Sequence, residues 1–172
     1  MHPVREYFLP DVCKLLNEPL ALTEDSEPRT PFDLILDLIK RIDSTRPEGG
    51  ILVFLPGWQE IKTLKARIND SIYKEEKHCV LTLHSMIPLK EQHLVFDALP
   101  KHRRKIVLAT NIAETAITIN DISYVIDVGN RRGQTYNPER EITTLDTQWI
   151  SKANAIQRRG RAGRVRAGEC YR

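Results

Sequence analysis

The chain of 172 residues is 41% hydrophobic and 28% charged, which suits one globular domain that can bury a core. Ten prolines and eight glycines are close to average usage and exclude a disordered, low-complexity or collagen-like chain. The net charge of +3 conceals an asymmetry, because residues 129–172 hold ten Lys and Arg against four Asp and Glu. Such a basic stretch is typical of a surface that meets phosphate or nucleic acid, although a solvated charged face has the same signature.

Three widely spaced cysteines without a CxxC pair favour reduced thiols over a disulfide framework or a zinc site. The longest apolar run, residues 51–56, is far shorter than the ~20 residues of a membrane helix, and the amino terminus starts no secretory signal. We therefore expect an intracellular protein, cytoplasmic or nuclear, with no membrane partner.

The first elements are an extended segment over residues 2–10, a surface loop over 18–28 and a helix that begins with Pro31. Residues 51–55 are wholly apolar, which predicts a strand buried on both faces of a parallel sheet. A second amphipathic helix follows over residues 58–73.

The rest of the chain continues the alternation of strand and helix. We expect strands over 80–83, 105–109 and 124–128, a helix over 89–99, and a projecting β-hairpin between 129 and 151 with its turn at 136–139. This alternation predicts the α/β class, with a parallel sheet that helices cover on both faces. Ligands of such sheets bind at the carboxyl ends of the strands.

Residues 157–164 read QRRGRAGR and follow an amphipathic segment that Ser151 can cap. We expect Arg161 and Arg164 to project from a turn whose glycines leave room for close approach, and to bind phosphate oxygens. Arginines placed in this way neutralise the charge on a transferring γ-phosphoryl group. The alternative is a basic loop that makes surface ion pairs or serves localisation.

The sequence contains no GxxxxGK[ST] phosphate loop and no DExH or DExD tetrad. This chain by itself is therefore not expected to hold ATP and Mg²⁺, and we predict that it contains no metal ligands. Arginine fingers without a phosphate loop indicate half of a composite site, with the other half on a second domain or subunit.

Four segments, in order and with matching spacing, resemble motifs IV, IVa, V and VI of the DEAH/RHA family of superfamily 2 RNA helicases. They are 54–61 (FLPGWQEI), 83–85 (LHS), 109–119 (ATNIAETAITI) and 157–164. The tryptophan in the first segment makes this segment similar to that of the RNA-helicase-A-like branch of the family. The resemblance implies that residues 1–172 form a single second RecA-like domain, the helicase C-terminal domain, of a larger multidomain protein. The preceding RecA-like domain would carry the phosphate loop and the DEAH box and would hold most of the Mg²⁺ contacts, so the chain alone is expected to be inactive.

The resemblance also implies nucleotide contacts. Gln157 would orient the attacking water, and Arg161 and Arg164 would contact the phosphates of ATP across the domain cleft. A helix-end amide that satisfies the backbone is the alternative for Gln157. Phe96 resembles the aromatic residue that stacks on the base, although its helical spacing also suits a core residue.

Two further residues match family positions near the ribose, Thr118 and Asn120. Many relatives have an aspartate where this chain has Asn120, so the contact would lose its charge assistance. The family role of Asn120 is therefore weaker than that of Thr118.

The implied RNA contacts come from strand ends. Thr110, Asn111, Ser85 and the backbone of Gly57 would touch the phosphates and 2′-hydroxyls of single-stranded RNA, a type of contact that reads no bases. The alternative for Thr110 and Asn111 is to cap the helical turn 112–115. His84 is expected to be structural, because no nucleophile pattern accompanies it.

The hairpin over 130–144 resembles the strand-separating hairpin of the family. Arg131, Arg132 and Arg140 would give it affinity for the nucleic-acid backbone. Glu114, Thr115 and Thr118 are expected to link the RNA contacts to the ATP contacts.

The resulting hypothesis is an ATP-dependent motor that moves 3′ to 5′ on single-stranded RNA or on a duplex with a 3′ overhang. A non-catalytic RNA-binding scaffold and a DNA translocase are the alternatives.

Overall fold

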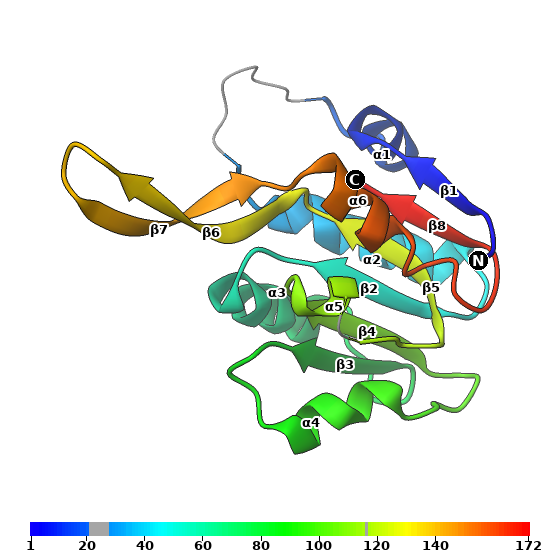
Figure 1. Ribbon diagram of the computed structural model, residues 1–172. Coiled ribbons are helices and arrows are strands. Elements are labelled where there is room, and N and C mark those ends of the chain that lie inside the picture. The colour runs from blue at the N-terminus through cyan, green and yellow to red at the C-terminus, as the bar shows by residue number, and fades with distance from the viewer. Residues whose placement is uncertain (21–27, 116) are drawn as a thin grey trace.

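The computed structural model describes residues 1–20, 28–115 and 117–172. Its centre is a six-stranded sheet in the order β1-β8-β5-β2-β4-β3, and every pairing in it is parallel (Figure 1). The strands are β1 Val4–Tyr7, β2 Gly50–Phe54, β3 His78–Leu83, β4 Arg104–Ala109, β5 Ile122–Asp127 and β8 Gly168–Tyr171. The predicted α/β class is confirmed.

Helices cover both faces of the sheet. Alternate residues of β2 divide between two cores, because Ile51 and Val53 belong to one and Leu52 and Phe54 to the other. The first core packs under α1 Leu9–Leu16, α2 Phe32–Thr45 and α3 Trp58–Ser71. The second packs under the 3-10 helix η1 Leu94–Phe96, α5 Ile112–Thr115 and the turn after α6 Lys152–Arg159, with α4 Leu89–His93 leading into η1. We call the side of the sheet that carries this second core the second face.

A long hairpin, β6 Asn130–Asn137 and β7 Ile142–Trp149, projects away from the sheet (Figure 1). Two backbone hydrogen bonds hold its root: the Arg132 N–H donates to the Pro56 carbonyl, just after β2, at 3.2 Å, and the Ile150 N–H closes the base of the hairpin on the Gly129 carbonyl at 2.9 Å. Gly129 has φ +75°, a conformation that glycine adopts without strain. The predicted hairpin is confirmed, but its turn lies at residues 138–141 and not at 136–139, because Tyr136 and Asn137 still pair with Thr143 and Ile142.

The expectation of an extended chain through residue 10 is wrong beyond Tyr7, because α1 begins at Leu9. The Asp11 carboxylate accepts the Phe8 N–H at 3.0 Å and so starts the helix, which buries Val12. Of the loop predicted over 18–28, residues 21–27 lie outside the described part of the chain.

The helix predicted over residues 89–99 is shorter than expected. It ends at His93, and the 3-10 turn that follows ends at Phe96. The Lys105 ammonium donates to the carbonyls of Val95 and Asp97, both at 2.7 Å, so these carbonyls serve a buried cation instead of continuing a helix.

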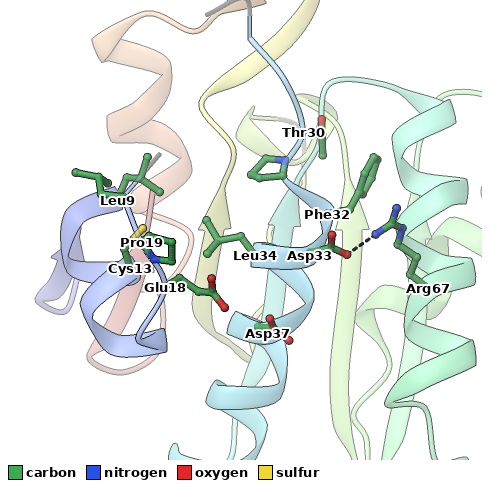
Figure 2. A pocket seen from close by; sticks show the side chains of 12 residues that line it. Leu9, Cys13, Glu18, Pro19, Thr30, Phe32, Asp33, Leu34, Asp37 and Arg67 are labelled. Carbon is green, nitrogen blue, oxygen red and sulfur yellow. Dashed lines mark hydrogen bonds and ion pairs between the residues drawn. The ribbon is translucent and has the colours of Figure 1, made fainter. Parts of the chain in front are cut away.

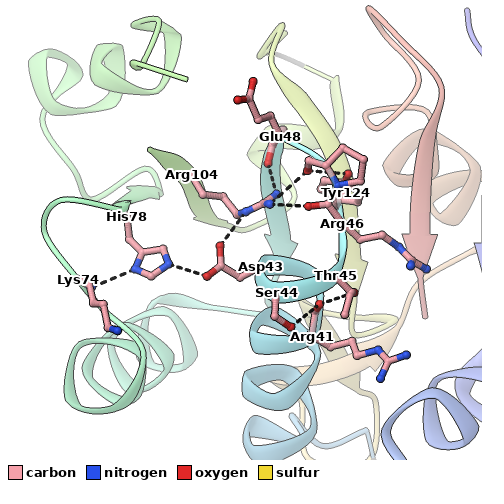
Figure 3. A network of polar contacts seen from close by, with 12 residues as sticks. Arg41, Asp43, Ser44, Thr45, Arg46, Glu48, Lys74, His78, Arg104 and Tyr124 are labelled. Atoms are coloured by element: carbon pink, nitrogen blue, oxygen red, sulfur yellow. Dashed lines mark hydrogen bonds and ion pairs between the residues drawn. The ribbon is translucent and has the colours of Figure 1, made fainter. Parts of the chain in front are cut away.

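At the amino ends of the strands a polar network joins α2 to β3 and β4 (Figure 3). The Asp43 carboxylate lies 3.0 Å from Nε2 of His78 and accepts from Nε of Arg104 at 2.9 Å. Nδ1 of His78 accepts the Lys74 N–H at 3.0 Å. Because these groups satisfy one another at the end of the sheet opposite the predicted ligand edge, we interpret the network as structural.

Candidate functional site

The loops that follow β2, β3 and β4 meet at one edge, because the carboxyl ends of parallel strands lie together. The Leu55 N–H donates to the Ala109 carbonyl at 2.8 Å, and the Thr110 N–H donates to the Leu83 carbonyl at 3.4 Å. The structure thereby brings together all four residues predicted to contact RNA from strand ends: Gly57, Ser85, Thr110 and Asn111.

These four residues differ in exposure. Ser85 and Asn111 are exposed, whereas Thr110 is buried. Gly57 is also buried, and a side chain there would meet Glu60 at 3.1 Å and Arg132 at 3.3 Å. Free side-chain donors at this edge therefore come from Ser85 and Asn111.

The start of α5 is built from the same residues. The Thr110 carbonyl accepts the Ala113 N–H at 3.2 Å, and the Asn111 carbonyl accepts the Glu114 N–H at 2.9 Å. Backbone carbonyls thus begin this helical turn, and the exposed Asn111 amide faces solvent.

The hairpin arginines also differ. Arg131, Arg132 and Arg140 are all exposed, but the Arg132 guanidinium also donates to the Glu60 carboxylate at 3.0 Å. The ion pair holds Arg132 against α3, so this arginine has less freedom to contact RNA than the other two.

The remaining predicted residues lie on the second face of the sheet. Phe96 is 47% exposed and follows the buried Val95, while Thr118 and Asn120 are exposed on either side of the buried Ile119. Because Val95 and Ile119 pack in the same core, the three exposed residues belong to segments that cover the same face of the sheet. The core alternative for Phe96 is wrong, since nearly half of its side chain reaches solvent.

Helix α6 carries the QRRGRAGR segment. Its amino end is capped as predicted, because the Ser151 hydroxyl accepts the Asn154 N–H at 3.1 Å. Gln157 is exposed near the end of the helix, and Arg164 is exposed after the turn.

Arg161 does not project as expected. Only 7% of the residue is exposed, and its guanidinium donates to the carbonyls of Glu114 and of Ile117, the latter at 2.8 Å. Burial, helped by the nearby charge of Arg164, lowers the pKa of Arg161. The arginine therefore holds the segment after α5 against the turn after α6.

The expected reason for the two glycines is also wrong for Gly163. A side chain at this position would lie 2.6 Å from the His2 carbonyl and 2.7 Å from Val4. The His2 N–H donates to the Gly163 carbonyl at 2.8 Å. Gly163 is needed for close packing against the amino-terminal strand, not for the approach of a phosphate.

His84 is structural, as predicted. Its Nδ1 accepts the Met86 N–H at 3.1 Å and its ring lies 5.5 Å from that of Trp58. Burial lowers the pKa of His84, so the neutral form that this hydrogen bond needs is favoured.

A pocket of about 550 Å³ lies elsewhere, between α1 and the start of α2 (Figure 2). An ion pair between Asp33 and Arg67, 2.6 Å long, stands at one side of it. None of the predicted site residues lines this pocket. The predicted site residues therefore lie outside this pocket, at the strand ends and on the second face.

Residues 31–166 match the model of the helicase conserved C-terminal domain. The chain belongs to this helicase C-terminal family. It is 44% identical to the human (Homo sapiens) ATP-dependent RNA helicase DHX30 over 99% of this chain and 15% of that protein. It is 51% identical to the Arabidopsis thaliana helicase DExH2, named as a DExH-box ATP-dependent RNA helicase, over 91% of this chain and 10% of that protein.

Among solved structures, the Escherichia coli DExH-box NTPase HrpB matches with a TM-score of 0.80 and 30% identity. The match covers 99% of this chain and 19% of HrpB, which confirms the expected RecA-like fold. This helicase C-terminal domain thus spans less than a fifth of the length of the relatives named here.

One buried arginine of this helicase C-terminal domain was not among the site residues that the motifs predicted. Arg158 is 0% exposed and donates to Glu114 at 2.7 Å and to Asp127 at 2.8 Å. A signal was present in the sequence, because Asp127 places a charge at the end of an otherwise apolar run. A buried carboxylate of this kind requires a cationic partner, but the sequence offers ten candidates after Gly129 and does not say which.

Proposed function

We propose that this domain is the second RecA-like motor domain of an ATP-dependent RNA helicase, and that residues 1–172 form this one domain within a longer chain. The observation that carries the proposal is the separation of two sets of exposed polar groups, one at the carboxyl edge and one on the second face. Glu114 links the two sets, because its N–H donates to the Asn111 carbonyl and its own carbonyl accepts a hydrogen bond from the Arg161 guanidinium. The names of the relatives, ATP-dependent RNA helicases, support the same assignment.

The second face fits one half of an ATP site. The exposed ring of Phe96 can stack on the base, and Thr118 and Asn120 can bond the ribose. The exposed amide of Gln157 and the guanidinium of Arg164 suit the phosphates and the attacking water. ATP supplies the free energy that closes and reopens the two domains.

The Mg²⁺ of the reaction would be held mainly outside this domain. Across residues 1–20, 28–115 and 117–172 no group of three His, Cys, Asp or Glu could hold a metal ion. We assign the metal to the preceding RecA-like domain of the same chain, so the isolated domain would not turn over ATP.

Arg161 and Arg164 would reach the phosphates of ATP in different ways. Arg164 already reaches solvent and would contact the transferring phosphoryl group across the domain cleft. Arg161 would join it once its guanidinium leaves the carbonyls of Glu114 and Ile117.

The carboxyl edge and the hairpin would hold the RNA. Ser85 and Asn111 would bond backbone phosphates and 2′-hydroxyls, and Arg131 and Arg140 would add charge along the hairpin. The substrate would be single-stranded RNA or a duplex with a 3′ overhang, and translocation would run 3′ to 5′.

The test is Arg164→Ala in the full-length protein. RNA-stimulated ATP turnover is expected to fall by roughly 10³-fold or more, the effect of losing an arginine finger. RNA affinity is expected to stay unchanged, because Arg164 lies away from the RNA edge. Unchanged turnover would contradict the assignment, and no turnover in the natural protein would favour the non-catalytic scaffold.

DNA is the second candidate substrate, because one relative, 45% identical over 88% of this chain, is named as an ATP-dependent DNA/RNA helicase, human DHX36. Binding titrations with ribose and deoxyribose forms of one strand separate the two substrates. Equal affinity would count against a preference for RNA.

We also propose an intracellular location, cytoplasmic or nuclear. All three cysteines are unpaired, and burial raises the pKa of Cys170 to about 11, which keeps this thiol protonated. No helix in the described part of the chain has the length and apolar character to cross a membrane. Imaging of the tagged full-length protein in living cells tests the location.

A further inference from the structure

Arg158 is the largest of the fully buried side chains, and the proposed chemistry does not use it. Its Nε donates to Glu114 at 2.7 Å, and one terminal nitrogen donates to Asp127 at 2.8 Å and to the Asn130 carbonyl at 3.2 Å. Its guanidinium also lies 4.8 Å from the centre of the Phe54 ring. The arginine is thus enclosed by protein groups and reaches neither the ATP face nor the RNA edge.

The partners of Arg158 belong to three functional elements. Glu114 lies in α5, which directly follows Asn111, one of the proposed RNA contacts. Asp127 ends β5, and its carboxylate also accepts the Gly129 N–H at 2.9 Å. Asn130 is the first residue of the hairpin and is fully buried. One guanidinium therefore holds α5, the end of the sheet and the root of the hairpin at the same point.

The turn after α6, residues 160–164, carries Arg161 and Arg164, and we call it the arginine-finger turn. It is attached to the same cluster. The Arg161 N–H donates to the Arg158 carbonyl at 3.1 Å, and the Arg161 guanidinium donates to the Glu114 carbonyl. The second carboxylate oxygen of Glu114 accepts the Asn154 amide at 2.9 Å, which fixes the other end of α6. A shift of the hairpin root would thus reach Arg161 through two connected residues.

Stability alone does not explain a buried ion cluster, because apolar side chains of similar volume are often as stable or more so. Two polar atoms of the cluster, the second terminal nitrogen of Arg158 and Oδ2 of Asp127, have no hydrogen-bond partner among the described residues. A small rotation that pairs these two atoms would make the contact bidentate. Pairing of these two atoms is the second arrangement that the proposed coupling requires.

We propose that Arg158 is a positioning residue that couples the root of the hairpin to the arginine-finger turn through Asp127 and Glu114. The inference rests on the proposed function and adds a route by which RNA at the hairpin alters the ATP site. Arg158 itself touches neither RNA nor nucleotide.

The experiment uses the full-length protein with Arg158→Lys, which keeps the charge but loses the planar fork that reaches two carboxylates. We expect the ratio of RNA-stimulated to basal ATP turnover to fall about 10-fold, within the usual range of coupling between sites. The KM for ATP is expected to stay unchanged, and more ATP is consumed for each duplex unwound. A merely structural role would lower the melting temperature but leave this ratio unchanged.

Arg159→Lys is the matched control, because the neighbouring arginine pairs with Glu6 at the edge of the sheet, at 2.6 Å. It is expected to keep the natural ratio. If Arg158→Lys does not fold, Asp127→Asn provides the same test, since the amide oxygen still accepts from Arg158 and Gly129 but the charge is gone.

Two results would overturn the inference: a natural ratio in Arg158→Lys and Asp127→Asn, or an equal loss in Arg159→Lys. The proposed function fails separately, if Arg164→Ala leaves ATP turnover unchanged. A loss of turnover in Arg164→Ala with a natural ratio in Arg158→Lys would keep the function and reject the coupling.

Discussion

Arg161 and Arg164 lie three residues apart but have different surroundings. The Arg161 guanidinium is buried against two backbone carbonyls, whereas Arg164 is exposed. The spacing of the motif could not show this difference, because burial depends on where α5 lies relative to α6. The sequence pattern identified both arginines but not the structural role of the first.

We predict that Arg161→Ala destabilises the fold and Arg164→Ala does not. Each hydrogen bond from a charged donor is worth about 1.5–3 kcal/mol, so the loss of both Arg161 contacts should lower the melting temperature by about 10 °C. Calorimetry of the two variants beside the natural protein checks this. Equal melting temperatures in all three would mean that the carbonyl contacts contribute nothing.

At the scale of elements, strands were predicted better than short helices. The wholly apolar run of β2 and the hairpin were found where the sequence indicated them. Helix α1 was missed because its eight residues follow an extended strand and are started by the Asp11 contact to Phe8. The 3-10 turn at Phe96 depends on Lys105, a residue nine positions later whose direction no local pattern reveals.

Helix α6 offers a clean test of local stability. Ser151→Ala removes the hydroxyl that accepts the Asn154 N–H and should cost about 1 kcal/mol, or about 3 °C in melting temperature. Thermal denaturation followed by circular dichroism measures it. Ser44→Ala is the control, because that hydroxyl bonds a carbonyl within its own helix at 3.2 Å and starts no helix.

For the whole molecule, the basic stretch at the carboxyl-terminal end resolves into paired and free charges. Arg158, Arg159 and Arg132 are committed to carboxylates, whereas Arg131 and Arg140 are exposed on the hairpin. Net charge therefore overstates the charge that is available to RNA. Composition predicted the patch, but only the fold shows which arginines are used within it.

The salt dependence of RNA binding should reflect this division. Arg131→Ala is expected to reduce the slope of log affinity against log salt by about 0.7, the value for one phosphate contact on a single strand. Arg132→Ala should change the slope less, because its guanidinium already pairs with Glu60. Titrations of the full-length protein at several salt concentrations measure both, and a larger effect for Arg132 would show that its ion pair opens on RNA.

The hairpin is long compared with its attachment. Its strands of eight residues extend for about 27 Å at ~3.4 Å per residue, while the root is held at Asn130 and Arg132. An arm of this shape is a mechanical lever: turning the root by about 10° displaces the tip by about 5 Å. This displacement exceeds the ~3.4 Å spacing of nucleotides along one strand of a duplex. A rotation too small to disturb the packing of the sheet is thus large enough, at the tip, to move past one base.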